Sequence, residues 1–171
     1  MNTITEEKLG DMAISSGVVR ISDPCYDKDV HCTGVIKNVK TGVWKPYVVL
    51  SDEGSWGIRN AVLVAHHSDH PIVESSLAWK KKRIDVGVDS GSAGIYDEAY
   101  FKGGEDDYGD DGWYDDNCNI VLKSQHSAGV LPDNMGVVSS SGFGDGGYNC
   151  YVATSGKKVV AIKIDFGVIE R

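Results

Sequence analysis

Short runs of β-forming residues, each ended by glycine, proline or aspartate, recur along the chain and restrict its fold more than any other feature. Such runs lie at positions 17–22, 32–39, 43–50, 56–65, 84–88, 119–123, 136–141, 148–154 and 158–166. Many short strands joined by glycine turns are typical of sandwiches and barrels. The sequence therefore predicts a mainly β protein: a single-domain β-sandwich or partly open barrel with long loops rich in glycine and acidic residues.

The length and charge of the chain restrict its domain count and its partners. With 171 residues, 41% of them hydrophobic, one β domain is expected over residues 17–171, after an N-terminal segment at 1–16. The net charge of −8 disfavours duplex nucleic acid, because phosphate binding needs a basic surface. No apolar run approaches a membrane span, and the first residues do not resemble a signal peptide. We therefore expect a cytoplasmic protein without a membrane partner.

Two segments depart from the strand pattern. Residues 74–82 are the one helix candidate in the body of the chain, and the run KKKR at 80–83 is the largest positive patch. Charged side chains of this kind are mostly a solvated face. Residues 102–117 are rich in glycine and acidic residues, which predicts a long exposed loop.

The segment GFGDGG at 142–147 fits the pattern G-x-G-x-x-G. The dinucleotide fingerprint needs a helix after this pattern, whereas residues 148–153 alternate as a strand does, so we exclude that interpretation. The simplest prediction is a hairpin loop, in which glycine adopts positive φ angles at low cost. The alternative is a ligand site, where backbone N–H groups and the hydroxyls of Ser139, Ser140 and Ser141 hold an anion or a ribose.

The candidate metal ligands lack the spacing that metal sites need. His66 and His70 would share one face of a strand two pleat repeats apart, which is too far for one ion. The acidic residues at 106–116 do not match a calcium loop, and the 4 cysteines contain no C-x-x-C pair, as a zinc ribbon would. We predict no metal site and no cofactor.

Four motifs, taken in order, carry a family resemblance. They are VRISDP at 19–24, VGVDSGSA at 86–93, SSGFGDGGY at 140–148 and VVAIKIDF at 159–166. This ordered set resembles the domain-of-unknown-function 4241 family of bacteria and phages, over most of residues 17–169. The resemblance implies a β fold and points to polar turns, without implying a reaction. The residues that match the family's polar turn positions are Asp23, Tyr26, Asp89, Ser90, Asp145 and Tyr148.

Two roles are open for the turn aspartates Asp23, Asp89 and Asp145. Aspartates in such turns commonly cap a loop by accepting backbone N–H bonds. The same carboxylates are candidate catalytic groups, because a pair of them could act as acid and base or bind a metal. A catalytic role requires that the turns converge and that the carboxylates have lone pairs open to a substrate or metal. A capping role requires only that each carboxylate accepts hydrogen bonds from the protein.

The function that we expect is non-catalytic binding of a small ligand, with a nucleotide as the leading candidate. Tyrosine can stack a base, and hydroxyls with backbone N–H groups can hold phosphate. The phage occurrence of the resembled family implies a protein that sequesters a nucleotide signal. A hydrolase of a cyclic nucleotide or related phosphodiester is one alternative, and a structural or interaction domain that could form a homo-oligomer is another. The residues expected to bind the ligand are Tyr26, Ser90, Ser139, Ser141, Gly144, Asp145, Gly146 and Tyr148.

Overall fold

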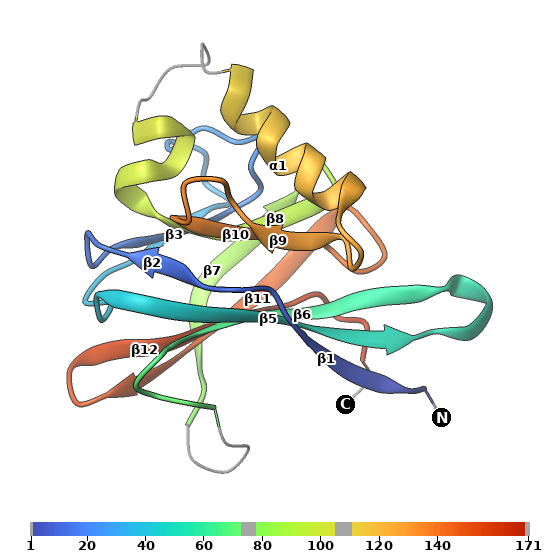
Figure 1. Ribbon diagram of the computed structural model, residues 1–171, viewed down its shortest axis with the longest axis horizontal. Helices are drawn as coiled ribbons and strands as arrows, with labels where there is room; N and C mark the ends of the chain where they lie inside the picture. The colour runs from blue at the N-terminus through green and yellow to red at the C-terminus, as the bar shows by residue number, and fades with distance from the viewer. Residues whose placement is uncertain (1, 73–77, 105–110, 170–171) are drawn as a thin grey trace.

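Two antiparallel β-sheets pack face to face, and a helix covers the outer side of the smaller sheet (Figure 1). The computed structural model describes residues 2–72, 78–104 and 111–169. The predicted mainly β, sandwich-like fold is confirmed, and the described strands form no closed barrel. Within the described ranges, no helix is long and apolar enough to cross a membrane.

The larger sheet has the strand order β1-β5-β6-β12-β11-β7, and β2 also pairs with β5. Its strands are β1 (Ile4–Lys8), β2 (Met12–Ile14), β5 (Gly42–Asp52), β6 (Ile58–His67), β7 (Lys80–Val88), β11 (Gly146–Ser155) and β12 (Lys158–Asp165). Pro46 lies in β5 opposite the gap between β1 and β2, where its carbonyl accepts a hydrogen bond from the Leu9 N–H. The N-terminal segment therefore forms part of this sheet.

The smaller sheet has the strand order β4-β3-β8-β10-β9. Its strands are β3 (Val19–Ser22), β4 (Gly34–Ile36), β8 (Ser92–Asp97), β9 (Ala128–Val130) and β10 (Gly136–Ser140). A short 3-10 helix, η1 (Gly54–Trp56), joins β5 to β6, while η2 (Glu98–Gly104) and α1 (Asp111–Lys123) follow β8.

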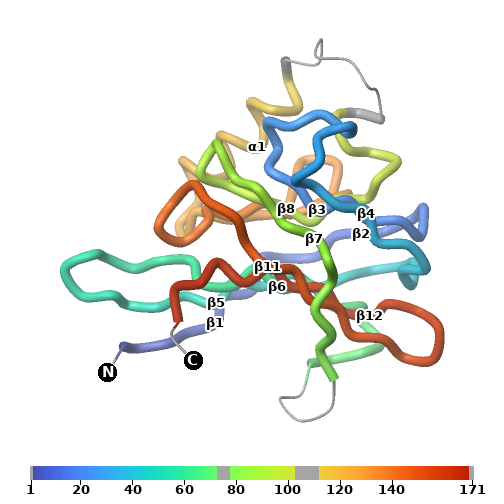
Figure 2. The backbone as a smooth tube through the Cα atoms, turned by 180° about the vertical axis from the view of Figure 1, so that it is seen from behind, coloured from blue at the N-terminus to red at the C-terminus, as the bar shows by residue number. Residues whose placement is uncertain are grey.

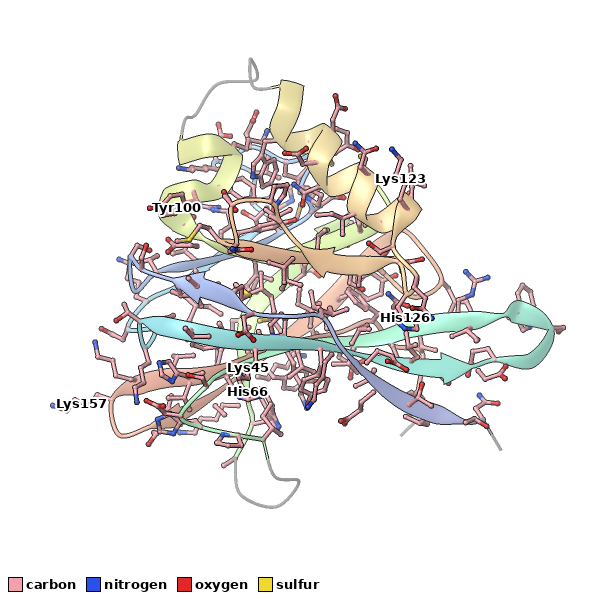
Figure 3. All side chains as sticks on the ribbon, viewed as in Figure 1. Lys45, His66, Tyr100, Lys123, His126 and Lys157 are labelled. Atoms are coloured by element: carbon pink, nitrogen blue, oxygen red, sulfur yellow. The ribbon has the colours of Figure 1, made fainter. Side chains whose placement is uncertain are left out.

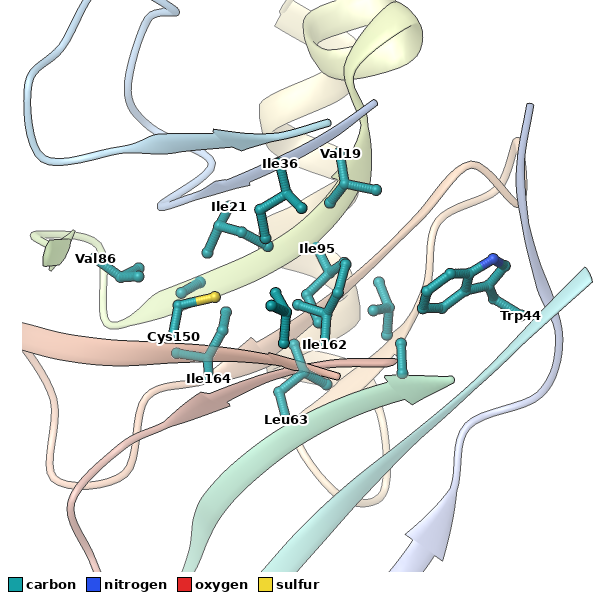
Figure 4. Packing of buried hydrophobic residues seen from close by; sticks show 14 of the residues in the cluster. Val19, Ile21, Ile36, Trp44, Leu63, Val86, Ile95, Cys150, Ile162 and Ile164 are labelled. Carbon is teal, nitrogen blue, oxygen red and sulfur yellow. The ribbon is translucent and has the colours of Figure 1, made fainter. Parts of the chain in front are cut away.

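The main core lies between the inner faces of the two sheets (Figure 4). Ile162 and Ile164 of β12 pack with Ile21 and Ile95 of the smaller sheet, and all four are fully buried. Lys163, between the two β12 isoleucines, is only partly buried. This alternation is the pattern of a strand with one buried face, and it explains why β12 was predictable from the sequence.

Helix α1 lies where the sequence predicted a loop and a strand. Residues 111–117 were expected in an exposed loop and residues 119–123 in a strand, and both expectations were wrong, because these residues are helical. Residues 105–110, also in the predicted loop, lie outside the described residues.

The helix forms because four residues recur at helical spacing and pack against the smaller sheet. They are Trp113, Asn117, Ile120 and Val121. Asn117 is fully buried, and its Oδ1 accepts a hydrogen bond from the Tyr96 hydroxyl at 2.8 Å. A polar residue in the middle of the buried face interrupts the apolar pattern, so this pattern does not predict the helix.

The predicted helix at 74–82 was also wrong where the structure describes it. Residues 80–82 begin β7, and residues 74–77 lie outside the described residues. The charged run has no apolar face for a helix to bury, whereas Lys82 continues the ladder with β11 opposite Cys150. β7 is an edge of the larger sheet, where charged side chains discourage pairing with another chain.

Two of the short connections between the sheets lie near the glycine-rich segment (Figure 2). Residues 89–91 lead from β7 to β8, and residues 141–145 lead from β10 to β11. The prediction of a hairpin loop at the glycine-rich segment was wrong, because β10 and β11 belong to different sheets. The segment needs its glycines to turn the chain between layers.

Candidate functional site

The first two aspartate turns meet at one corner of the sandwich. Asp23 follows β3, and its Oδ2 accepts hydrogen bonds from the backbone N–H groups of Asp89 at 2.8 Å and Ser90 at 2.7 Å. The connection from β7 to β8 is therefore fixed to the end of β3. We call the region around Asp23, Asp89 and the glycine-rich crossover the Asp23 corner.

The third turn, the glycine-rich crossover, reaches the same corner. The N–H of Ser141 donates to the carbonyl oxygen of Gly91 at 3.0 Å. At the other end of the crossover, Gly146 pairs with Val88 in the β7–β11 ladder. Asp145 is the residue just before Gly146, as Asp89 is the one just after Val88, so all three turns converge.

The carboxylate of Asp23 is fully occupied by the protein itself. Besides the two N–H groups on Oδ2, its Oδ1 accepts the Cys25 N–H and the Ser90 hydroxyl, each at 2.7 Å. A carboxylate has about four lone-pair positions, and Asp23 is fully buried. Asp23 therefore caps two turns, and it has no lone pair left for a metal or a substrate proton.

The glycine-rich crossover is held in shape by its own hydroxyls. The carbonyl oxygen of Gly144 accepts hydrogen bonds from the Ser141 hydroxyl at 2.7 Å and from the Tyr148 hydroxyl. Gly144 has a φ of 122° and Gly142 a φ of 68°, values that favour glycine. Burial raises the pKa of Tyr148. The predicted site residues Ser141 and Tyr148 thus bind the loop backbone.

Tyr26 closes the exposed side of the corner. Its hydroxyl donates to Asp89 Oδ2, and burial, followed by the bonds to Asp89 and Cys32, raises the pKa of Tyr26. Burial, together with the neighbouring Asp23, also raises the pKa of Cys25 to about 12. The thiol of Cys25 is therefore protonated near neutral pH, which makes it a poor nucleophile.

The loop that carries Tyr26 is anchored by Arg20. The guanidinium makes two hydrogen bonds to Glu98, at 2.6 and 2.8 Å, and Nη1 donates to the carbonyl oxygen of Lys28 at 3.1 Å and to Thr33 Oγ1 at 3.0 Å. Arg20 is almost fully buried. Such a bidentate ion pair fixes the orientation of both groups, so the Asp23 corner is positioned by rigid neighbours.

Ser139 lies away from the other predicted ligand-binding residues. Its side chain is fully buried, its hydroxyl donates to the carbonyl oxygen of Ser140 at 2.8 Å, and it accepts from Asn60 Nδ2 at 2.9 Å. Its alternation with Ser140 along β10 turns it toward the interior. A strand pattern could have predicted this, because adjacent residues point to opposite faces.

The histidines at the end of β6 contact other groups of the protein. His67 Nε2 lies 2.9 Å from the carbonyl oxygen of Thr41, and its Nδ1 accepts the Asp69 N–H at 3.1 Å. His66 lies beside Lys45 on the outer face of the larger sheet (Figure 3). Among the residues that the structure describes, no group of three or more His, Cys, Asp or Glu side chains could hold a metal ion.

A cationic hollow opens next to the Asp23 corner, on the edge strand β7. It has a volume of about 600 Å³ and is lined by Lys81, Lys82, Arg83, Ile84, Asp85 and Asn149. The pairing changes register between Asn149 and Cys150, which leaves Arg83 and Ile84 in a bulge. Bulges redirect side chains. We call this hollow the β7 hollow.

A second hollow adjoins it on β11 and contains the aromatic residues. It has a volume of about 260 Å³, shares Asn149 with the β7 hollow, and includes Tyr148, Tyr151 and Asp165. Tyr151 pairs with Lys81 on one side and with Lys163 on the other. Cations and tyrosines therefore lie side by side on this surface.

The cations of the β7 hollow were predicted as the largest positive patch, but their place on a strand was not predicted. The available signal was the alternation at 84–88, which continues backward to Lys82 as β7. The neighbouring residue Trp79 also lies against the larger sheet, where the Nζ of Lys163 on β12 is 4.4 Å from the centroid of its ring.

Comparisons of the chain with known protein families, with curated proteins and with solved structures found no match. The resemblance to the domain-of-unknown-function 4241 family therefore stays a prediction.

Proposed function

We propose that this protein binds a small anionic ligand that carries an aromatic ring, a nucleotide being the matching class, and that it releases the ligand unchanged. The observation that carries the proposal is the β7 hollow. Three consecutive cations, Lys81, Lys82 and Arg83, line a concave surface of about 600 Å³ on a chain whose net charge is −8.

The cations of the β7 hollow suit a phosphate group. None of the three forms an ion pair with a described residue. Like charges held together repel one another, and an anion between them relieves that repulsion. Arginine and lysine bind phosphate through strong, charge-assisted hydrogen bonds, so a ligand phosphate would take the place of the missing partners.

The adjoining hollow suits a nucleobase. Tyr151 presents a ring, over which the Nζ of Lys163 lies 5.3 Å from the centroid. Stacking on such an aromatic side chain contributes about 1–3 kcal/mol per base. Asn149 lines both hollows, and an amide can donate and accept hydrogen bonds at a base edge. A nucleotide would therefore span the two hollows, with its phosphates toward β7.

The Asp23 corner supports binding over hydrolysis. The carboxylate of Asp23 already accepts four hydrogen bonds, and the exposed residues Asp89 and Asp145 add negative charge that repels phosphate. The corner shapes the ends of β7 and β11, and the ligand would lie on the strands beside it.

The test is isothermal titration calorimetry with ATP, a cyclic dinucleotide, adenosine and inorganic tripolyphosphate. We expect the nucleotides to bind more tightly than either adenosine or tripolyphosphate, because only they engage both hollows. At a free ligand concentration of 100 times Kd, the protein should gain about 2.7 kcal/mol of stability. Chromatography of the mixtures should return the nucleotide intact.

The matched variants are Lys82→Gln in the β7 hollow and Lys157→Gln in the exposed turn between β11 and β12. Both remove one positive charge, and only the first should weaken nucleotide binding, roughly tenfold. If both variants weakened nucleotide binding equally, the nucleotide would be attracted by the overall charge of the protein and the β7 hollow would not be its site. Absence of heat from every nucleotide would refute the proposal. Conversion of the nucleotide would show that the protein is a hydrolase and would also refute non-catalytic binding.

A further inference from the structure

A separate pocket of about 350 Å³ lies at the opposite edge of the larger sheet, between β1 and the turn that joins α1 to β9. Thr5 and Glu7 line it from β1, and Thr3 lines it from just before that strand. These alternate residues point to one face of the strand. His126 lies across from them, between the end of α1 and the larger sheet (Figure 3).

The pocket is elongated along β1, with a carboxylate toward each end. The Asp52 N–H donates to the carbonyl oxygen of Thr3 at 2.9 Å, so Asp52 lies beside the start of β1. Glu7 lies four residues further along, which corresponds to about 13 Å of extended strand. Leu50 pairs with Thr5 between them and contributes an apolar wall.

Asn60 supplies an acceptor that is open to the pocket. Its side chain is only 5% exposed, and its Nδ2 is used in hydrogen bonds to the carbonyl oxygens of His126 and Ser127 and to Ser139 Oγ. No described residue donates a hydrogen bond to its Oδ1, although Asn60 lines the pocket. This oxygen is not among the buried atoms without a partner, so it can accept a hydrogen bond from a ligand in the pocket.

The charge of the pocket excludes an anion. Its lining contains Glu7 and Asp52 and neither lysine nor arginine. The one ionisable group of the other sign is His126, whose Nε2 lies 3.6 Å from Glu7 Oε2. Threonine hydroxyls and the Asn60 carbonyl add further acceptors. The pocket therefore differs in sign from the β7 hollow.

We propose that this pocket binds a linear diamine or polyamine. An ammonium group has three donors, which the Glu7 carboxylate and the Thr5 hydroxyl can accept. Asn60 Oδ1 lies on the other side of Leu50 and can accept from an amine further along the ligand. A second ammonium, carried by the same chain, would lie near Asp52. The methylene groups between them would pack on Leu50. Burial of apolar surface on both the ligand and Leu50 is favourable.

Calorimetry with spermidine, 1,4-diaminobutane, butylamine and 1,4-butanediol at physiological ionic strength tests the proposal. We expect the two polyamines to bind at least tenfold more tightly than butylamine, which has one ammonium, and butanediol to give no heat. Glu7→Gln and Asp52→Asn, which keep the side-chain shape, should each weaken spermidine binding about tenfold. Thermal melting should show that both variants remain folded.

The matched control is Glu6→Gln, which removes the same charge one residue away on the opposite face of β1. Spermidine affinity should change less than twofold in this variant. If Glu6→Gln weakened binding as much as Glu7→Gln, spermidine would be attracted by the net charge of the protein and the pocket would not be its site. Equal binding of butanediol and diaminobutane, or no heat from any amine, would also overturn the proposal.

Discussion

The Asp23 corner and the β7 hollow both lie along β7 and β11, yet their charged groups find partners in different ways. In the corner, four donors of the protein surround the buried carboxylate of Asp23. In the hollow, Lys81, Lys82 and Arg83 line open space and form no ion pair with a described residue. Of these two regions, the better candidate for a binding site is the one where the protein leaves its charged groups without partners.

This difference predicts opposite consequences of mutation. A satisfied buried group contributes to stability, so substitution in the corner should unfold the protein more easily and affect a ligand only indirectly. An exposed cation contributes little to stability, so substitution in the hollow should change binding and leave folding intact.

The largest effect is expected from Asp23→Ala. The substitution leaves the N–H groups of Cys25, Asp89 and Ser90 without their acceptor. The expected loss in the free energy of unfolding is about 3–5 kcal/mol, because several buried donors become unsatisfied together. Urea unfolding measures it, with the exposed Asp29→Ala of the same loop as control. A loss below about 1 kcal/mol would mean that the corner is solvated and open to ligands.

The capping role of Asp23 could be predicted from the sequence, and its partners could not. Aspartate in a turn after a strand commonly accepts backbone N–H bonds, and this prediction is confirmed for Asp23. Its partners, however, lie 66 and 67 positions away in Asp89 and Ser90. No local pattern relates these positions, because the contact depends on the order of strands in two sheets.

The strands themselves were predictable where one face is buried and the other is not. β12 alternates and was found, whereas the first half of β7 is charged on both faces and was taken for a helix. Helix α1 was missed because Asn117 occupies its buried face. These misses follow from tertiary contacts: the neighbouring strand β11 and the Tyr96 hydroxyl stabilise residues whose own pattern is not apolar.

A second, smaller effect concerns the core directly beneath the β7 hollow. Burial raises the pKa of Cys150 to about 12 from an ordinary value of 9.0. The thiol therefore loses its proton at a lower pH in the unfolded chain than in the folded chain. The contribution of Cys150 to the free energy of unfolding is thus fully present below about pH 9 and is lost as the pH rises toward 12. Linkage gives a slope of at most about 1.4 kcal/mol per pH unit from this group.

Urea unfolding at pH 8, 9 and 10 measures this slope, and Cys150→Ala is the comparison. The variant should be less stable than the wild type at pH 8, because a buried side chain is shortened. The difference between the two proteins should shrink as the pH rises. A difference that stays constant would show that the Cys150 thiol does not titrate differently in the folded and unfolded states.

The smallest effect is expected from Asp145→Asn, at the point where the corner meets the strands of the hollow. Asp145 is exposed, and no described residue donates a hydrogen bond to its carboxylate. Loss of its charge also reduces repulsion with the nearby Asp89. The free energy of unfolding should therefore change by less than about 0.5 kcal/mol.

Asp89→Ala is the informative partner for this variant, because it removes the acceptor of the Tyr26 hydroxyl and should cost about 1 kcal/mol. Asp145→Asn should leave nucleotide affinity within about twofold and produce no change in the nucleotide recovered by chromatography. A general acid or base contributes roughly 10²–10⁴-fold to turnover. If wild-type protein converts a cyclic nucleotide and Asp145→Asn abolishes that conversion, the corner is an active site and its contrast with the β7 hollow no longer holds.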